Sequence, residues 1–198
     1  MVKDSISALV LVLAVAISLA AAARVFRSDL PRDEVIDHVR LGRRLAKEDL
    51  SDQPRSSKLE LARRLEQGLG EGYDWQADFD RLSPRDQERF LDNLSELMYV
   101  SILDKVDVYF ALPPADRTAY LDAEIDHVMG WPLVAANRGA PLADRVGSAP
   151  AKFVEQVRQR YAEADPAQRR RMIEFATAVY QRWMARGAGR IRGQFGEG

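Results

Sequence analysis

Two histidines are the side chains of this sequence best suited to acid–base or metal chemistry, and each stands in an Ile-Asp-His-Val tetrapeptide. His38 follows Glu34 by four residues, which places the imidazole and the carboxylate on one side of a helix. His127 follows Asp122 by five residues and Asp126 directly. Imidazole and carboxylate ligands at helical spacing are typical of Zn²⁺, Mn²⁺ and iron sites. A metal-binding helical protein that uses these five residues is therefore one hypothesis.

The spacing argues against a carboxylate-bridged metal centre of the kind found in helical bundles. Such a centre takes a Glu-x-x-His pair from each of two helices and one glutamate from each of two more. The interval between Glu34 and His38 misses that spacing by one residue, and no other segment completes the ligand set. The simpler interpretation places both histidines at solvated helix ends, in a protein that holds no cofactor.

Other catalytic chemistry has no motif to support it. The chain contains no cysteine, which excludes a thiolate nucleophile, a thiolate metal site and a disulfide framework. The sequence also lacks the Gly-x-Ser-x-Gly turn of serine hydrolases and a glycine-rich phosphate loop after a strand. These observations favour a non-enzymatic protein.

Charge is distributed unevenly along a chain whose formal net charge is only −1. Residues 72–130 carry thirteen acidic and five basic side chains, whereas residues 166–198 carry seven basic and two acidic ones. The two regions can pair within the molecule, or each can bind a partner protein. The candidate partner-binding residues are the acidic Glu96, Asp104 and Asp107 and the basic Arg169, Arg170 and Arg171.

The basic C-terminal region also contains aromatic residues, among them Tyr180, Trp183 and Phe195. Arginines beside aromatic rings bind phosphate groups, so a further alternative is a C-terminal helix that binds anionic lipid or nucleic acid. Nucleic-acid binding also requires a cytoplasmic domain, and we do not expect it. The plainer alternative buries the aromatic rings in the core and pairs the arginines with the acidic region.

The elements that position these residues begin with an apolar segment at residues 6–23, in which Ser7 and Ser18 are the only polar side chains. A helix of that length spans roughly 27 Å, close to the thickness of a thin hydrocarbon core. Arg24 and Arg27 can reach the lipid headgroups, so residues 6–26 can complete one transmembrane helix. We therefore predict a single-pass protein of the cell membrane.

The alternative for this segment is a cleaved secretory signal, with small residues at the cleavage positions near Ala22 or Ala23. The product would then be a secreted or periplasmic protein. Arginines after the apolar segment favour a cytoplasmic main domain under the positive-inside rule. A long domain behind one N-terminal helix often crosses regardless of charge, and the signal-like alanine run leads us to predict an extracytoplasmic domain.

After residue 30, apolar residues recur at helical spacing and no alternating strand pattern is found. The sequence therefore predicts an all-α fold, with an N-terminal transmembrane (or signal) helix followed by an irregular bundle of about five to six helices. Helices are expected at residues 31–47, 58–69, 73–82 (a short one), 84–110, 114–129, 150–164 and 166–186. Prolines at the first helical position and capping side chains at Ser83 and Asp165 support these starts.

Three parts of the chain follow from this pattern. Residues 1–27 are the anchor or signal, and residues 28–186 are one helical domain. A stretch rich in Gly, Pro and Ala at 130–149 is a candidate hinge within it. Residues 187–198 are expected to be a flexible Gly/Arg tail.

Taken together, these features predict a membrane-tethered, non-enzymatic helical adaptor or scaffold protein of the bacterial envelope. Arginine outnumbers lysine by 24 to 5, which is typical of a GC-rich bacterial genome. The protein would bind a protein partner through its charged helix faces. A small-molecule ligand has no signal in the sequence.

Overall fold

The computed structural model describes residues 32–73, 75–132 and 151–195, and within these ranges the chain is all-helical, as predicted. The helices are α2 (Arg32–Lys47), α3 (Arg55–Glu71), α4 (Trp75–Asp80), α5 (Pro84–Ala111), α6 (Pro114–Gly130), α9 (Ala151–Glu163) and α10 (Pro166–Phe195). The predicted membrane segment, residues 6–26, and most of the candidate hinge lie outside the described residues. Among the helices that the structure describes, none is both long enough and apolar enough to cross a membrane.

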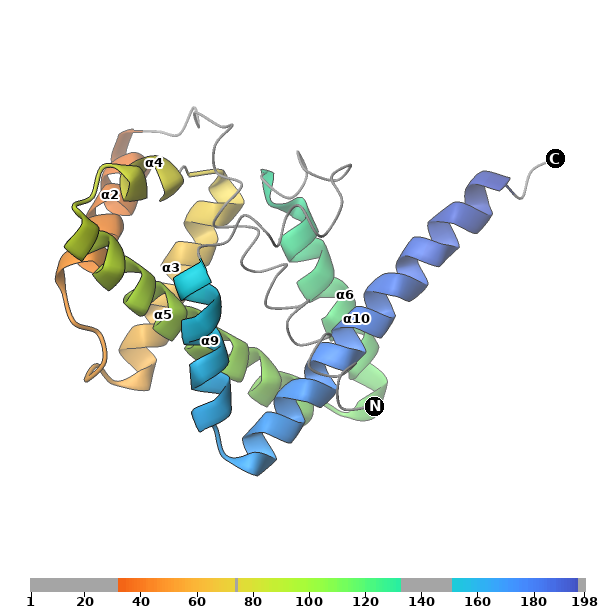
Figure 1. The fold of residues 1–198 in the computed structure, drawn as a ribbon. Helices are drawn as coiled ribbons and strands as arrows, with labels where there is room; N and C mark the ends of the chain where they lie inside the picture. The colour runs from red at the N-terminus through yellow and green to blue at the C-terminus, as the bar shows by residue number, and fades with distance from the viewer. Residues whose placement is uncertain (1–31, 74, 133–150, 196–198) are drawn as a thin grey trace.

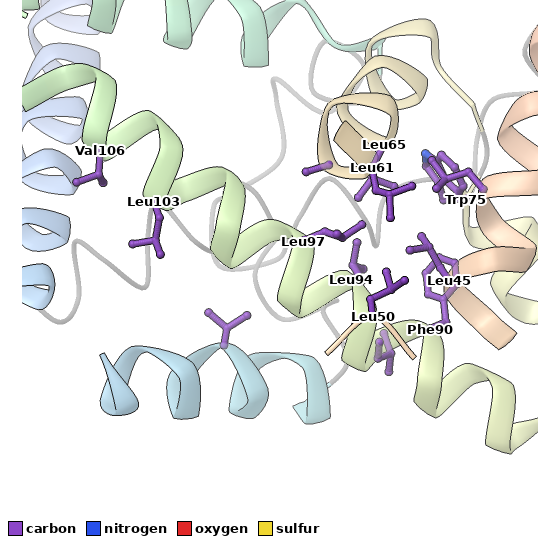
Figure 2. Packing of buried hydrophobic residues seen from close by; sticks show 14 of the residues in the cluster. Leu45, Leu50, Leu61, Leu65, Trp75, Phe90, Leu94, Leu97, Leu103 and Val106 are labelled. Carbon is purple, nitrogen blue, oxygen red and sulfur yellow. The ribbon is translucent and has the colours of Figure 1, made fainter. Parts of the chain in front are cut away.

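The 28-residue helix α5 lies at the centre of the bundle and packs against α2, α3, α4, α9 and α10 (Figure 1). At one end of α5, Phe90, Leu94 and Leu97 meet leucines of α2 and α3 and Trp75 of α4 (Figure 2). At the other end, Val106 lies in the same apolar cluster as residues of α9 and α10. One continuous core therefore joins nearly all the helices through α5.

Apolar residues at 3- and 4-residue spacing predict one apolar stripe on α5, made of Leu91, Leu94, Met98, Ile102, Val106 and Tyr109. The structure buries more of the helix than that stripe. Leu91, Leu94 and Val106 of the predicted stripe are buried. Phe90, Leu97, Val100 and Leu103, which lie off the stripe, are buried as well. The difference arises because helices cover α5 on more than one side, so α5 is a central helix and not a surface helix.

Helix starts follow the capping chemistry that the sequence predicts. The Ser83 hydroxyl accepts a hydrogen bond from the backbone N–H of Asp86, and Pro84 occupies the first position of α5. At α10, the carboxylate of Asp165 accepts bonds from the N–H groups of Ala167 and Gln168, each at 2.9 Å. These caps satisfy backbone donors that a helix leaves without partners.

The end of α10 differs from the expectation. The helix continues to Phe195, whereas the sequence predicts an end at Arg186 and a flexible tail over residues 187–198. Glycine ends a helix when it takes a left-handed conformation, as Gly72 does after α3 with φ +81°. Glycine inside a helix costs only about 1 kcal/mol relative to alanine, and alanine and arginine in the same stretch favour the helix. As a result, α10 extends beyond the body of the bundle (Figure 1).

Candidate functional site

The arginines of α9 and α10 pair with the carboxylates of α5 and α6, and we call this set of contacts the arginine seam. It consists of five pairs, Arg160–Glu96, Arg171–Asp107, Arg182–Asp122, Arg186–Asp122 and Arg186–Asp126. Arg171, Arg182 and Arg186 belong to the basic C-terminal region, and Arg160 precedes it. The basic end and the acidic middle of the chain thus pair in part within the molecule, through these three arginines.

The contact between α6 and α10 has the geometry of a two-point clasp. The Arg182 guanidinium donates to both carboxylate oxygens of Asp122, at 2.8 and 2.6 Å. One turn further, Arg186 donates to the backbone oxygen of Asp122 and to the Asp126 carboxylate. The hydrogen bonds from Arg182 hold the pKa of Asp122 below its ordinary value, and the Asp126 contact raises the pKa of Arg186. Paired hydrogen bonds of this kind fix orientation as well as distance.

Asp107 lies between two arginines from different helices. Arg55 at the start of α3 donates to it at 2.8 Å, and Arg171 of α10 approaches it at 3.1 Å. The Arg171 guanidinium also lies over the ring of Phe110, 5.0 Å from its centroid. Arg171 is therefore held on two sides, by a carboxylate and by an aromatic face.

Glu96 is the most enclosed acid of the seam. Lys58 of α3, whose side chain is only 9% exposed, donates to Glu96 at 2.7 Å and to the backbone oxygen of Ser51. Arg160 of α9 contacts the other oxygen of the same carboxylate. The carboxylate of Glu96 therefore compensates two cations at once, and it ties α9 and α3 to α5.

The predicted partner-binding residues are placed as follows. Asp104 contacts Arg63 at 3.6 Å, and Glu96, Asp107 and Arg171 have the internal partners given above. Arg169 and Arg170 have no ion-pair partner among the described residues, and Arg170 is exposed. The acidic residues lie along one helix as predicted, but internal cations occupy them. Their binding to another protein stays a prediction.

His38 is buried, with 6% of its surface exposed, so the interpretation of a solvated helix end is wrong for this residue. Its Nε2 atom lies 2.7 Å from Oε2 of Glu71, and its ring packs against Tyr73 and Trp75. This burial is possible because Gly68 of α3 lacks a Cβ, which would lie 3.0 Å from Nδ1 of His38. A sequence pattern on α2 alone carries no signal of that close approach by α3.

His127 is exposed, as expected, and its ring lies edge-on to Trp131 with 5.5 Å between centroids. Its neighbours Asp122 and Asp126 hold arginines, and nothing is described of the Glu34 side chain. Within the described ranges, no group of three or more His, Asp or Glu side chains is arranged to hold a metal ion. The structure thus gives four of the five candidate ligands other partners: an acid for His38, an aromatic ring for His127 and arginines for the two aspartates.

Lys105 is a half-buried cation, with 25% of its side chain exposed, that no sequence motif marked. It lies between Glu66 of α3 and Glu124 of α6, at 3.5 and 2.7 Å. Burial alone would lower the pKa of Lys105, but the two carboxylates outweigh burial and raise it. In the sequence, the position of Lys105 on α5 cannot be distinguished from that of a surface lysine. Only the packing of three helices reveals it.

Among the described side chains of α10, two large apolar ones are exposed, and both lie in its outer part. Trp183 is 37% exposed and Met184 is 49% exposed. The other two tryptophans, Trp75 and Trp131, are 4% and 7% exposed. The sequence analysis grouped Trp183 with either a core or a ligand-binding role, and the structure places it at the surface.

Comparison with known proteins adds no family or fold relative, because no family model, curated protein or solved structure matches the chain.

Proposed function

We propose that this protein is a membrane-tethered helical adaptor or scaffold of the bacterial envelope. Residues 6–26 would hold it in the cell membrane, and the helical body would bind a protein partner on the extracytoplasmic side. The role is binding and positioning, without a chemical step. This proposal narrows the binding surface to the first turns of α10.

The observation that carries the proposal is the placement of Arg169 and Arg170. Both lie near the N-terminus of α10, where the helix dipole disfavours cations by about 0.3–1 kcal/mol each. Their neighbour Arg171 offsets that cost through Asp107 and Phe110. Arg169 and Arg170 have no described ion-pair partner. An acidic segment of a partner protein would offset their unfavourable interaction with the helix dipole.

The tether would act by limiting the distance between the helical body and the bilayer. Residues 27–31 separate the predicted span from α2, and five extended residues reach at most about 17 Å. The body would therefore stay near the bilayer, where a second membrane-bound protein meets it at high effective concentration. Even a weak contact through two arginines is then sufficient for association.

Site-specific crosslinking tests the proposed surface. In the full chain, Arg170 is replaced by a photo-crosslinking amino acid, and cells are irradiated. The matched control places the same amino acid at Arg43, an exposed arginine of α2 that also has no described ion-pair partner. We expect one discrete adduct from position 170 and none from position 43. Identical adduct patterns from both positions would contradict a defined partner surface.

Two further measurements test the tether and the sidedness. We expect the full chain to stay with membranes after alkaline carbonate extraction, whereas a cleaved or soluble protein is released. A topology reporter fused after residue 198 should be active only outside the cytoplasm. A cytoplasmic reporter would overturn the predicted orientation.

A further inference from the structure

The two halves of α10 have different surroundings. In the inner half, Met172, Phe175 and Ala176 are buried in the core. In the outer half, the Arg182 and Arg186 clasp is the connection to α6, while Trp183 and Met184 face solvent. The ring of Trp183 also lies near that of Tyr180, one turn back on α10, with 6.4 Å between the centroids. The outer half therefore presents apolar surface that the described bundle does not cover.

The sequence of the same region is free of acidic residues. Between Glu174 and Glu197 no Asp or Glu occurs, whereas four arginines do. Arg182 and Arg186 pair with aspartates of α6, and the sequence places two further arginines, Arg190 and Arg192, after them. Exposed tryptophan and methionine followed by arginines in a stretch without acids is a composition that favours an anionic lipid surface.

We propose that the outer half of α10 is a second membrane contact, which lies on an anionic bilayer surface through Trp183 and Met184. This inference rests on the membrane tether of the proposed function. Tryptophan is favoured at the level of the lipid headgroups, since its ring is apolar and its N–H is polar. The arginines that follow would contact lipid phosphates. The tether and α10 together would fix the orientation of the body relative to the membrane.

The arrangement of the helices agrees with two contacts on one surface. The start of α2, which follows the predicted span, and the free end of α10 both lie toward the top of Figure 1. One bilayer above the molecule in that view can be approached by both ends. A second copy of the chain is disfavoured as the occupant, because it would bring another arginine-bearing helix without acids and like charges repel.

Site-specific labelling of the full chain tests this contact, and the absence of cysteine makes each label unique. An environment-sensitive fluorophore is attached to Met184→Cys, and the matched control carries it at Val108→Cys, which is 41% exposed on α5. The labelled chains are reconstituted into vesicles of neutral phosphatidylcholine or of phosphatidylcholine with phosphatidylglycerol. We expect the label at 184, and not at 108, to be shielded from iodide and quenched by brominated lipid in the anionic vesicles only.

Replacing the arginines of outer α10 tests whether their charge contributes to the lipid contact. Each arginine near an anionic surface contributes about fivefold to binding, so Arg190→Gln with Arg192→Gln should weaken lipid contact of the label at 184 by roughly twentyfold. The double replacement of the exposed Arg43 and Arg85 by Gln, on other helices, should leave it unchanged. High salt should reproduce the loss.

Three outcomes would overturn the inference. Equal iodide access at 184 and 108 in anionic vesicles rules out lipid contact. Shielding that grows with the protein density in the vesicles indicates a second copy of the chain. Shielding of the label at 184 that appears in cells but not in vesicles indicates a protein partner. Flotation of the full chain with neutral vesicles after a salt wash measures the tether separately. Flotation without shielding is a failure of this inference alone, whereas loss of flotation from neutral vesicles is a failure of the proposed tether.

Discussion

The core around α5 and the contact between α6 and the outer half of α10 are held by different interactions. Around α5, Leu45, Leu50 and Leu97 have no exposed surface at all, and helices close on them from several directions. Between α6 and outer α10, the described contacts are the hydrogen bonds of Arg182 and Arg186 to two aspartates. One region depends on removing apolar surface from water, and the other depends on charges that water still reaches.

This difference indicates which part of the molecule should resist changes of salt and pH and which part should respond to them. Apolar burial does not titrate and is not weakened by charge screening, so the α5 core should keep its structure over a wide range of pH and ionic strength. Partly exposed ion pairs contribute little to global stability and are screened by salt. The outer half of α10 is therefore the part of the described chain that ionic conditions can release.

Shortening a fully buried leucine of the core should have the largest effect. Leu97→Ala removes apolar contacts at the centre of α5 and should lower the free energy of unfolding by about 4 kcal/mol. The matched control Val108→Ala lies on the same helix but is exposed, and it should change that energy by less than about 0.5 kcal/mol. Urea unfolding of the detergent-solubilised chain, followed by circular dichroism, measures both. Similar losses for the two variants would contradict the central burial of α5.

Removing the enclosed carboxylate of the seam should have the next largest effect. Glu96→Gln leaves Lys58 and Arg160 without their shared anion and should cost about 3 kcal/mol, because an uncompensated buried charge is costly. Asp104→Asn breaks the more exposed contact with Arg63 and should cost below about 1 kcal/mol. The same unfolding experiment compares the two variants. If Glu96→Gln is as mild as Asp104→Asn, the Glu96 contacts belong with the exposed pairs and not with the core.

Two glycines of α3, Gly68 and Gly70, compare a tightly packed core position with a loosely packed one on the same helix. A Cβ at Gly68 would lie 3.0 Å from both His38 Nδ1 and a Trp75 ring carbon, whereas a Cβ at Gly70 would lie 3.7 Å from Trp131. Gly68→Ala should therefore destabilise the chain by about 2 kcal/mol through overpacking. Gly70→Ala should be neutral or stabilise it by up to about 1 kcal/mol, because alanine favours the helix. Equal effects would mean that His38 and Trp75 yield easily, which would argue against a rigid core at this point.

The sequence predicts the core region better than the contacts of outer α10. Each predicted helix from residue 31 onward begins and ends within three residues of the observed bounds, apart from the end of α10. Periodicity and capping are local properties, so they are visible in one sequence. The burial of His38 and the partial burial of Lys105 depend on helices from distant parts of the chain, which no local pattern encodes.

The candidate site was predicted in part for the same reason. The acidic middle and the basic end of the chain indicated pairing or partner binding, and the structure pairs Arg171 with Asp107. The clasp had a sequence signal that the analysis did not use. Arg182 and Arg186 are four residues apart, as are Asp122 and Asp126, so two helices packed side by side can match them in register. Which acidic pair meets which basic pair depends on the packing of α6 against α10.

The smallest expected effect on global stability belongs to the clasp itself. Arg182→Gln should leave the unfolding midpoint unchanged within error, because the pair is partly exposed. It should nevertheless increase hydrogen exchange at the backbone amides of residues 180–186, while the amides around Leu97 stay protected. A buried control such as Leu97→Ala should do the reverse and lower protection across α5.

Acid provides an independent way to open the same contact. The Asp122 pKa is lowered in the folded chain by the bonds from Arg182, so the contribution of this pair is fully present above the ordinary aspartate pKa and is lost as pH falls through the lowered value. We therefore expect protection of residues 180–186, corrected for intrinsic exchange, to persist just below pH 3.8 and to fall at more acidic pH. In Arg182→Gln the loss should begin at a higher pH, because the carboxylate no longer has that guanidinium. Salt near 1 M, where the Debye length is about 3 Å, should mimic acid in the wild-type chain. If outer α10 instead keeps full protection under both conditions, apolar packing and not the arginine clasp holds it, and the division into two regions fails.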